Sequence, residues 1–193
     1  MTGVRGDGTA QAVSAFLLDR AHLLLPLASQ LGRVQTEFES AIRGSSMAPA
    51  IPGGTRLRVR LGGQMPCQIG DVVFYLVDGG YTVHRVVHRA RRTSDSDYLL
   101  AEGDARFAPD PPVPCRQVLG TVVAVQIDGR WQPVGPRPPG SWNGRVVRSM
   151  TLTAMIVTMW FSVGAAKRLA GLLLTLETRA RLARRRLLHL RAW

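Results

Sequence analysis

A series of short β-type runs, separated by turn residues, occupies the middle of this chain and most constrains its fold. The clearest run, 71–77, is apolar, β-branched and aromatic, and it ends in Asp78-Gly79-Gly80, a hairpin turn signal. Five more segments have a strand-like character: 57–60, 81–89, 97–102, 118–127 and 131–134. Short strands between Gly, Pro and Asp turns predict a mainly β domain over residues 42–134, built as a small antiparallel barrel or sandwich.

Helical patterns flank this β domain. Apolar side chains in residues 10–40 follow helical spacing, which predicts an amphipathic helical segment over residues 1–41. The first ten residues are polar and include an acid, so a signal peptide is not expected there. A Pro/Gly-rich stretch predicts a linker over 135–148, and 149–193 is expected to hold an apolar helix and a basic tail.

The C-terminal segment indicates membrane association. Residues 149–166 contain no charge and reach the usual length threshold for a spanning helix, although Ser and Thr dilute their hydropathy. The chain has a net charge of +12, and residues 167–193 hold eight basic residues against one acid. We expect a single membrane pass through 149–166, or a basic helix on an anionic surface. A cytoplasmic protein, with this helix packed on the β domain or in a homodimer, is the alternative.

A serine in a turn-rich loop and a histidine on a later strand are the candidate reactive residues. Ser46 lies in GSSMAP at residues 44–49, and His84 lies in TVHRVV at 82–87. A serine hydroxyl needs a base to remove its proton, and neutral imidazole suits that task near pH 7. The only lysine, Lys167, lies in the tail, so histidine is the base available within the β domain.

Spacing makes two of the histidines mutually exclusive. His84 and His88 share one face of a strand but lie about 13 Å apart at about 3.3 Å per residue, so both cannot serve Ser46. The two cysteines, Cys67 and Cys115, lack the number and spacing of a metal site or a disulfide framework. No metal and no cofactor are expected. The arginine-rich tail has no base-reading motif beside it, so no specific nucleic acid is expected either.

Four ordered boxes resemble a known family. They are GSSMAPAIPGG, GDVVFY, YTVHRVV, and LLAEGDARFAPD followed by VLGTVVAV, and together they cover roughly residues 42–127. The chain resembles the serine-protease superfamily of signal peptidase I and the LexA-type self-cleaving repressors, and within it the histidine-dependent archaeal and endoplasmic-reticulum signal peptidases. The resemblance implies a signal-peptidase-type β fold and a serine endopeptidase that cleaves leader or signal peptides through an acyl-enzyme. Its partner would be an extended peptide on an exposed strand edge.

The resemblance also implies the roles of the reactive residues. Ser46 matches the nucleophile, and His84, in its HRVV context, matches the general base in preference to His88. Asp104 and Asp110 match two family acids, one of which orients the histidine. We favour Asp104, because Asp110 lies in a Pro-rich turn that has a loop-shaping role of its own.

Residues around the serine are expected to stabilise the oxyanion and position the substrate, namely Gly44, Ser45 and Met47. Signal peptidases commonly carry a serine two residues before the nucleophile, where this chain has Gly44. Backbone N–H groups of the 44–46 turn and the Ser45 hydroxyl are therefore both candidate donors. The Gly70-Asp71 pair matches a family position that we interpret as structural.

Two other functions fit part of the sequence. A LexA-like self-cleaving regulator needs a helix-turn-helix and a catalytic lysine, and residues 1–40 offer no convincing helix-turn-helix. A catalytically silent peptide- or membrane-binding module would keep the β domain and act through the basic tail. The four intact boxes favour the serine endopeptidase over both alternatives.

Overall fold

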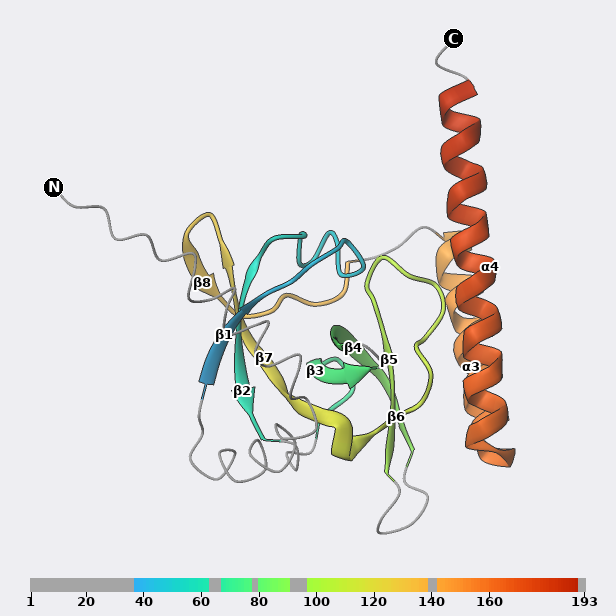
Figure 1. The fold of residues 1–193 in the computed structure, drawn as a ribbon, viewed down its shortest axis with the longest axis horizontal. Helices are drawn as coiled ribbons and strands as arrows, with labels where there is room; N and C mark the ends of the chain where they lie inside the picture. The colour runs from blue at the N-terminus through green and yellow to red at the C-terminus, as the bar shows by residue number, and fades with distance from the viewer. Residues whose placement is uncertain (1–36, 63–66, 78–79, 91–96, 139–141, 191–193) are drawn as a thin grey trace, which may run out of the picture.

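The protein is a mainly antiparallel β-sheet with two C-terminal helices (Figure 1). The computed structural model describes residues 37–62, 67–77, 80–90, 97–138 and 142–190. The strands are β1 Glu37–Ala41, β2 Arg56–Leu61, β3 Val72–Val77, β4 Gly80–Ala90, β5 Tyr98–Glu102, β6 Val113–Pro114, β7 Val118–Ile127 and β8 Arg130–Gln132. A 3₁₀ turn, η2, spans Cys115–Gln117, and the helices are α3, Trp142–Phe161, and α4, Val163–Leu190.

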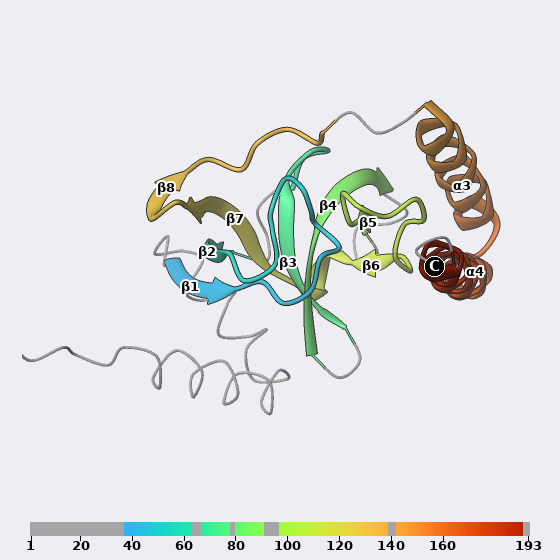
Figure 2. The same cartoon turned by 90° about the horizontal axis from the view of Figure 1, so that it is seen from above.

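The strands form one open sheet. Its order is β1-β2-β7-β3-β4-β5-β6, and β8 pairs with β7. The predicted mainly β class and antiparallel pairing are confirmed, but the described strands do not close into the barrel that we expected. The helices lie beside the β5 and β6 end of the sheet, and β1, β2 and β8 lie at the other end (Figure 2).

Strand β3 is at the centre because both of its faces are apolar. Val72 and Phe74 belong to one core cluster, whereas Val73 and Tyr75 belong to a second cluster on the opposite face. A strand that is buried on both sides appears in the sequence as a continuous apolar run, which is how residues 71–77 read. The first cluster also contains Met47 of the loop that follows β1.

The turn signals place the central strands in register. Strand β3 pairs with β4 from Val72↔Arg85 to Val77↔Gly80. Asp128 and Gly129 have φ values of 50° and 77°, the left-handed backbone that a type I′ hairpin between β7 and β8 requires. All six segments predicted as strands overlap observed strands.

The N-terminal prediction was wrong where it can be compared. Residues 37–41, expected to end a helical segment, form strand β1, whose Glu37 pairs with Arg60 of β2 at 3.0 Å. The Phe38 ring packs edge-on against Phe74 with a centroid distance of 5.4 Å. This cross-strand packing and pairing outweigh the local helical spacing. Residues 1–36 lie outside the described part of the chain.

The C-terminal segment is a pair of packed helices. The prediction of one helix over 149–166 was wrong, because α3 ends at Phe161 and α4 begins at Val163, with Ser162 between them. The Ser162 hydroxyl accepts a hydrogen bond from the Ala165 N–H at 3.3 Å and so caps α4. Helix α3 also begins at Trp142, inside the stretch that was expected to be a linker over 135–148.

Small residues let the two helices approach each other. Ala166 and Ala170 of α4 pack with Met155 and Met159 of α3, and Leu100 of β5 completes this cluster. The hairpin is thereby attached to the sheet (Figures 1 and 2). Among the described residues, no helix combines the length and the apolar character that crossing a bilayer needs.

Candidate active site

Ser46 is held in a rigid turn just after β1. Gly44 has a φ of 85°, a left-handed conformation that glycine adopts without strain. The Met47 side chain, which we expected to position substrate, is fully buried in the core instead. The buried Met47 side chain therefore anchors the loop to the core, while Ser46 remains partly exposed.

His84 of β4 meets Ser46 directly. The distance from His84 Nε2 to Ser46 Oγ is 2.9 Å, and the histidine side chain is only 5% exposed. Buried surroundings fix the ring in one orientation, which a general base requires. The structure thus brings together two residues that are 38 positions apart in the sequence.

Asp110 contacts the other side of the imidazole. Its Oδ2 forms a hydrogen bond with His84 Nδ1. Because a carboxylate only accepts hydrogen bonds, Nδ1 carries the ring proton and Nε2 is left to accept the proton of Ser46. The three side chains form a continuous chain of hydrogen bonds from hydroxyl to carboxylate.

Tyr75 of β3 is a fourth member of this chain. Its hydroxyl donates to Asp110 Oδ2 at 2.6 Å and lies 3.4 Å from His84 Nδ1. Burial raises the pKa of Tyr75 well above its usual value, and the negative charge of Asp110 raises it further. The phenol therefore stays protonated and acts as a permanent donor to the carboxylate.

Asp104 does not contact the histidine, so our preference for it as the orienting acid was wrong. Both of its carboxylate oxygens are bound by Arg85, at 3.0 Å from Nε and 2.9 Å from Nη2. Arg85 follows His84 on the strand, so its side chain leaves the opposite face of the sheet. Its guanidinium also donates to the carbonyls of Gly70 and Gly135. Asp104 thus belongs to a structural ion pair behind the site.

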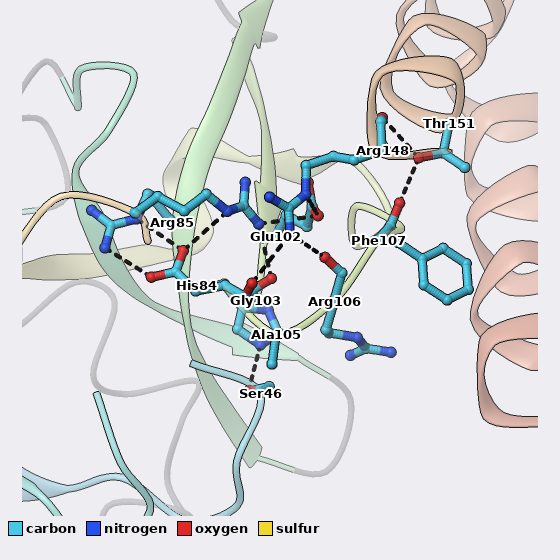
Figure 3. A network of polar contacts seen from close by, with 12 residues as sticks. Ser46, His84, Arg85, Glu102, Gly103, Ala105, Arg106, Phe107, Arg148 and Thr151 are labelled. Carbon is cyan, nitrogen blue, oxygen red and sulfur yellow. Dashed lines mark hydrogen bonds and ion pairs between the residues drawn. The ribbon is translucent and has the colours of Figure 1, made fainter. Parts of the chain in front are cut away.

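Glu102 is the centre of a buried charge network, and its contact with Arg148 is visible in Figure 3. One of its oxygens meets Arg137 at 3.0 Å and Arg148 at 2.8 Å. Burial raises the pKa of Glu102, and the two guanidiniums partly offset that effect. Burial also disfavours the charged form of Arg137 and so lowers the pKa of its guanidinium. A buried carboxylate with two cationic partners ties β5 to the segments that carry these arginines.

The 103–110 loop packs against the backbone of Ser46. The Ala105 N–H donates to the Ser46 carbonyl at 2.8 Å. A Cβ on Gly103 would come within 2.6 Å of that carbonyl oxygen, so no larger residue fits there. The same loop therefore touches Ser46 at one end and supplies Asp110 to His84 at the other.

A cleft of about 210 Å³ opens beside Ser46 and His84. Ile42 and Arg43 line one side, and residues 80–84 of β4 line the other. Strand β5 pairs with β4 only from Arg85 onward, so residues 80–84 have β3 on one side and, among the described strands, no partner on the other. An extended peptide is one kind of ligand that can pair with such an edge.

The remaining predicted residues lie around this centre. Ser45 is exposed, and its carbonyl accepts from the Ala48 N–H at 3.1 Å. His88 is not part of the hydrogen-bonded series of Ser46, His84 and Asp110. It lies beyond a bulge in the β4–β5 pairing, and burial lowers its pKa. The Gly70 carbonyl binds Arg85, which fits the structural role that we assigned to this position. Within the described residues, no group of His, Cys, Asp or Glu side chains is arranged to hold a metal ion.

Sequence reasoning missed Tyr75, although a signal for it exists. Val73 pairs with His84, so Tyr75, two residues along β3, lies on the same face as the histidine. The Asp78-Gly79-Gly80 turn signal would have given this register if the hairpin had been extended residue by residue.

The arrangement has the features of a nucleophilic centre: a partly exposed hydroxyl, a buried imidazole, and a carboxylate on its far nitrogen. No protein-family model matches this chain, and no curated protein matches it either.

Proposed function

We propose that this protein is a serine endopeptidase of the signal-peptidase type that cleaves leader or signal peptides. The hydrogen-bonded chain from Ser46 through His84 to Asp110 is the observation that carries the proposal. His84 Nε2 would take the proton of Ser46 Oγ as the oxygen attacks the scissile carbonyl, and would return that proton to the leaving amine. Water would then hydrolyse the acyl-enzyme by the same route.

Asp110 and Tyr75 would support this proton transfer. The carboxylate holds the imidazole in the tautomer that leaves Nε2 free to accept, and it stabilises the imidazolium formed during attack. The tyrosine hydroxyl holds the carboxylate in turn. Backbone N–H groups of the 44–46 turn, where Gly44 replaces a side-chain donor, are the proposed oxyanion stabilisers.

The unpaired edge of β4 supports a peptide substrate. A peptide lying along residues 80–84 would add backbone hydrogen bonds to β4 and would pass Ile42 and Arg43 on its other side. This path ends at His84, so the peptide bond at its end would reach Ser46. Selection would then depend on the side chains that the 210 Å³ cleft accepts.

Cleavage of a defined peptide pool tests the proposal. We expect the wild-type protein to cut members of a synthetic library of leader and signal peptides, detected by mass spectrometry. Ser46→Ala and His84→Ala should each abolish cleavage while leaving the circular dichroism spectrum unchanged. Full cleavage by Ser46→Ala on a mapped site would overturn the mechanism, and binding without cleavage by the wild type would favour a silent peptide-binding module.

We also propose that the helical hairpin associates with an anionic membrane surface. Trp160 and Phe161, at the turn between the helices, are 80% and 81% exposed. Lys167 and Arg168, in the first turns of α4, are exposed as well. Aromatic rings next to cations suit the headgroup region of an anionic bilayer, where the rings insert and the cations meet phosphates. Such a surface would place the protease beside membrane-bound leader peptides.

A further inference from the structure

The backbone of the 103–110 loop is held by side chains from the C-terminal part of the chain. Five consecutive carbonyls, from Gly103 to Phe107, each accept a hydrogen bond from a residue between positions 137 and 181. The pairs are Arg137 with Gly103 at 2.9 Å, Arg148 with Asp104 at 3.1 Å and with Arg106 at 2.6 Å, Arg181 with Ala105 at 2.8 Å, and Thr151 with Phe107 at 2.6 Å.

Three of these four donors belong to the helical hairpin. Arg148 and Thr151 lie on α3 and reach toward the loop (Figure 3), and Arg181 lies on α4. Arg148 also binds the buried Glu102 at 2.8 Å, which anchors its guanidinium. These hydrogen bonds add to the loop's own contacts, in which the Gly103 carbonyl also accepts from the Arg106 N–H at 2.9 Å and the Ala105 N–H donates to the Ser46 carbonyl at 2.8 Å. They satisfy carbonyls of a loop that lies between strands.

Side chains of the loop reinforce the same connection. Arg106 lies 3.5 Å from Glu177 of α4 on one side and 3.8 Å from Asp110 on the other. Glu177 is almost fully buried, and it also binds Arg181. A chain of charged contacts thus runs from α4 to the carboxylate that contacts His84.

We propose that the α3–α4 hairpin is a positioning element of the active site, in which Arg148, Thr151 and Arg181 hold the 103–110 loop so that Asp110 meets His84. This inference rests on the proposed function, because it concerns the same serine and histidine. None of the three donors contacts the nucleophile itself; each acts through the loop backbone. A displacement of about 1 Å at a catalytic group costs as much as about 100-fold in rate, so a loosened loop would be visible in kinetics.

The reactivity of Ser46 toward a fluorophosphonate measures this coupling without a known substrate. Ser46 Oγ forms a bond to phosphorus, fluoride leaves, and His84 takes the hydroxyl proton. We expect Thr151→Val to lower the maximal labelling rate roughly three- to tenfold and Arg148→Ala to lower it roughly 10- to 100-fold, because both changes loosen the Asp110 loop. The probe concentration for half-maximal rate should stay unchanged, since the cleft is untouched.

Matched variants separate positioning from general destabilisation. Thr153→Val changes an exposed threonine on the same helix, and Arg179→Ala removes an exposed arginine two residues before Arg181. Both controls should label at the wild-type rate. Thermal unfolding of every variant shows whether the protein is folded at the assay temperature, and Thr151→Val keeps the test valid if Arg148→Ala unfolds.

A double-mutant cycle with Asp110→Asn gives the decisive readout. If the hairpin acts through Asp110, Thr151→Val should lower the labelling rate much less in the Asp110→Asn background than in the wild type. Equal losses in both backgrounds, or wild-type rates for Thr151→Val and Arg148→Ala, would overturn the positioning role alone. A wild-type protein that does not label at Ser46 would overturn the proposed function and this inference with it.

Discussion

His84 is held between two oxygen atoms, and each contact constrains the other. Nε2 lies 2.9 Å from Ser46 Oγ, and Nδ1 contacts Asp110, whose position is fixed by Tyr75 at 2.6 Å. All of these groups except Ser46 are buried. In a low-dielectric setting, hydrogen bonds to a charged carboxylate are stronger than in water, so the tyrosine matters for the orientation of the imidazole.

Removal of the Tyr75 hydroxyl tests this dependence. Tyr75→Phe leaves the ring in the core but takes away a hydrogen bond to a charged acceptor, worth about 1.5 kcal/mol. We expect the fluorophosphonate labelling rate of Ser46 to fall roughly tenfold. Tyr98→Phe, on β5, removes a hydroxyl that does not take part in the hydrogen bonds of Ser46, His84 and Asp110, so it should not change the labelling rate. A Tyr75→Phe protein that labels at the wild-type rate would show that Asp110 needs no such support.

At the scale of elements, the strands could be predicted because they are bounded by turn chemistry. The 71–77 run and its Asp78-Gly79-Gly80 signal gave β3 and the start of β4 correctly. Strand β1 could not be predicted, because its pairing with β2 and the contact of Phe38 with Phe74 are long-range. Local spacing favoured a helix there, and tertiary packing outweighed it.

The candidate site, like the strands, could be predicted only where its residues stand in local sequence patterns. Ser46 and His84 stand in local motifs from which their pairing was predicted, and the structure places them 2.9 Å apart. The choice between Asp104 and Asp110 depends on how the 103–110 loop folds back, and this is set by Arg85 and by donors up to 76 residues away. Single-sequence patterns contain no information on contacts at that separation.

The turn between α3 and α4 is predicted to bind anionic membranes through Trp160 and Phe161. Trp160→Ala combined with Phe161→Ala should reduce flotation of the protein with phosphatidylglycerol vesicles by roughly tenfold or more, because two exposed rings no longer insert. Flotation of the wild type with neutral phosphatidylcholine vesicles, or at high salt, should also be weaker. Ile69→Ala removes an apolar residue that is 67% exposed outside the hairpin, and should have no effect. Unchanged flotation of the double variant would contradict the proposal that this surface binds the membrane.

At the scale of the whole molecule, the sheet and the helical hairpin share one polar network. The buried Glu102 links β5 to Arg137 and to Arg148 of α3, and Arg106 links the loop to Glu177 of α4. Removing one partner from such a network leaves a buried charge without compensation. We therefore expect the sheet and the hairpin to unfold together in a single transition.

A histidine outside the site, His88, contributes to the pH dependence of that transition. Burial lowers the pKa of His88, so the folded state holds it neutral at pH values where the unfolded chain binds a proton. The contribution of His88 to stability is therefore present above its unfolded pKa and is lost as the pH falls below it. Chemical denaturation at pH 7.5 and pH 5 should show a smaller acid-induced loss of unfolding free energy for His88→Gln than for the wild type. Equal losses in the two proteins would contradict the inference that His88 contributes to the loss of stability at low pH.

The most direct test of the central claim is to locate a fluorophosphonate adduct by peptide mass spectrometry. The account predicts one adduct on Ser46 in the wild-type protein, and its loss in Ser46→Ala. It also predicts a labelling rate at least roughly 100-fold lower in His84→Ala, because the base that takes the serine proton is gone. An adduct on Ser45 or on another residue, or labelling of Ser46 at the same rate without His84, would contradict it.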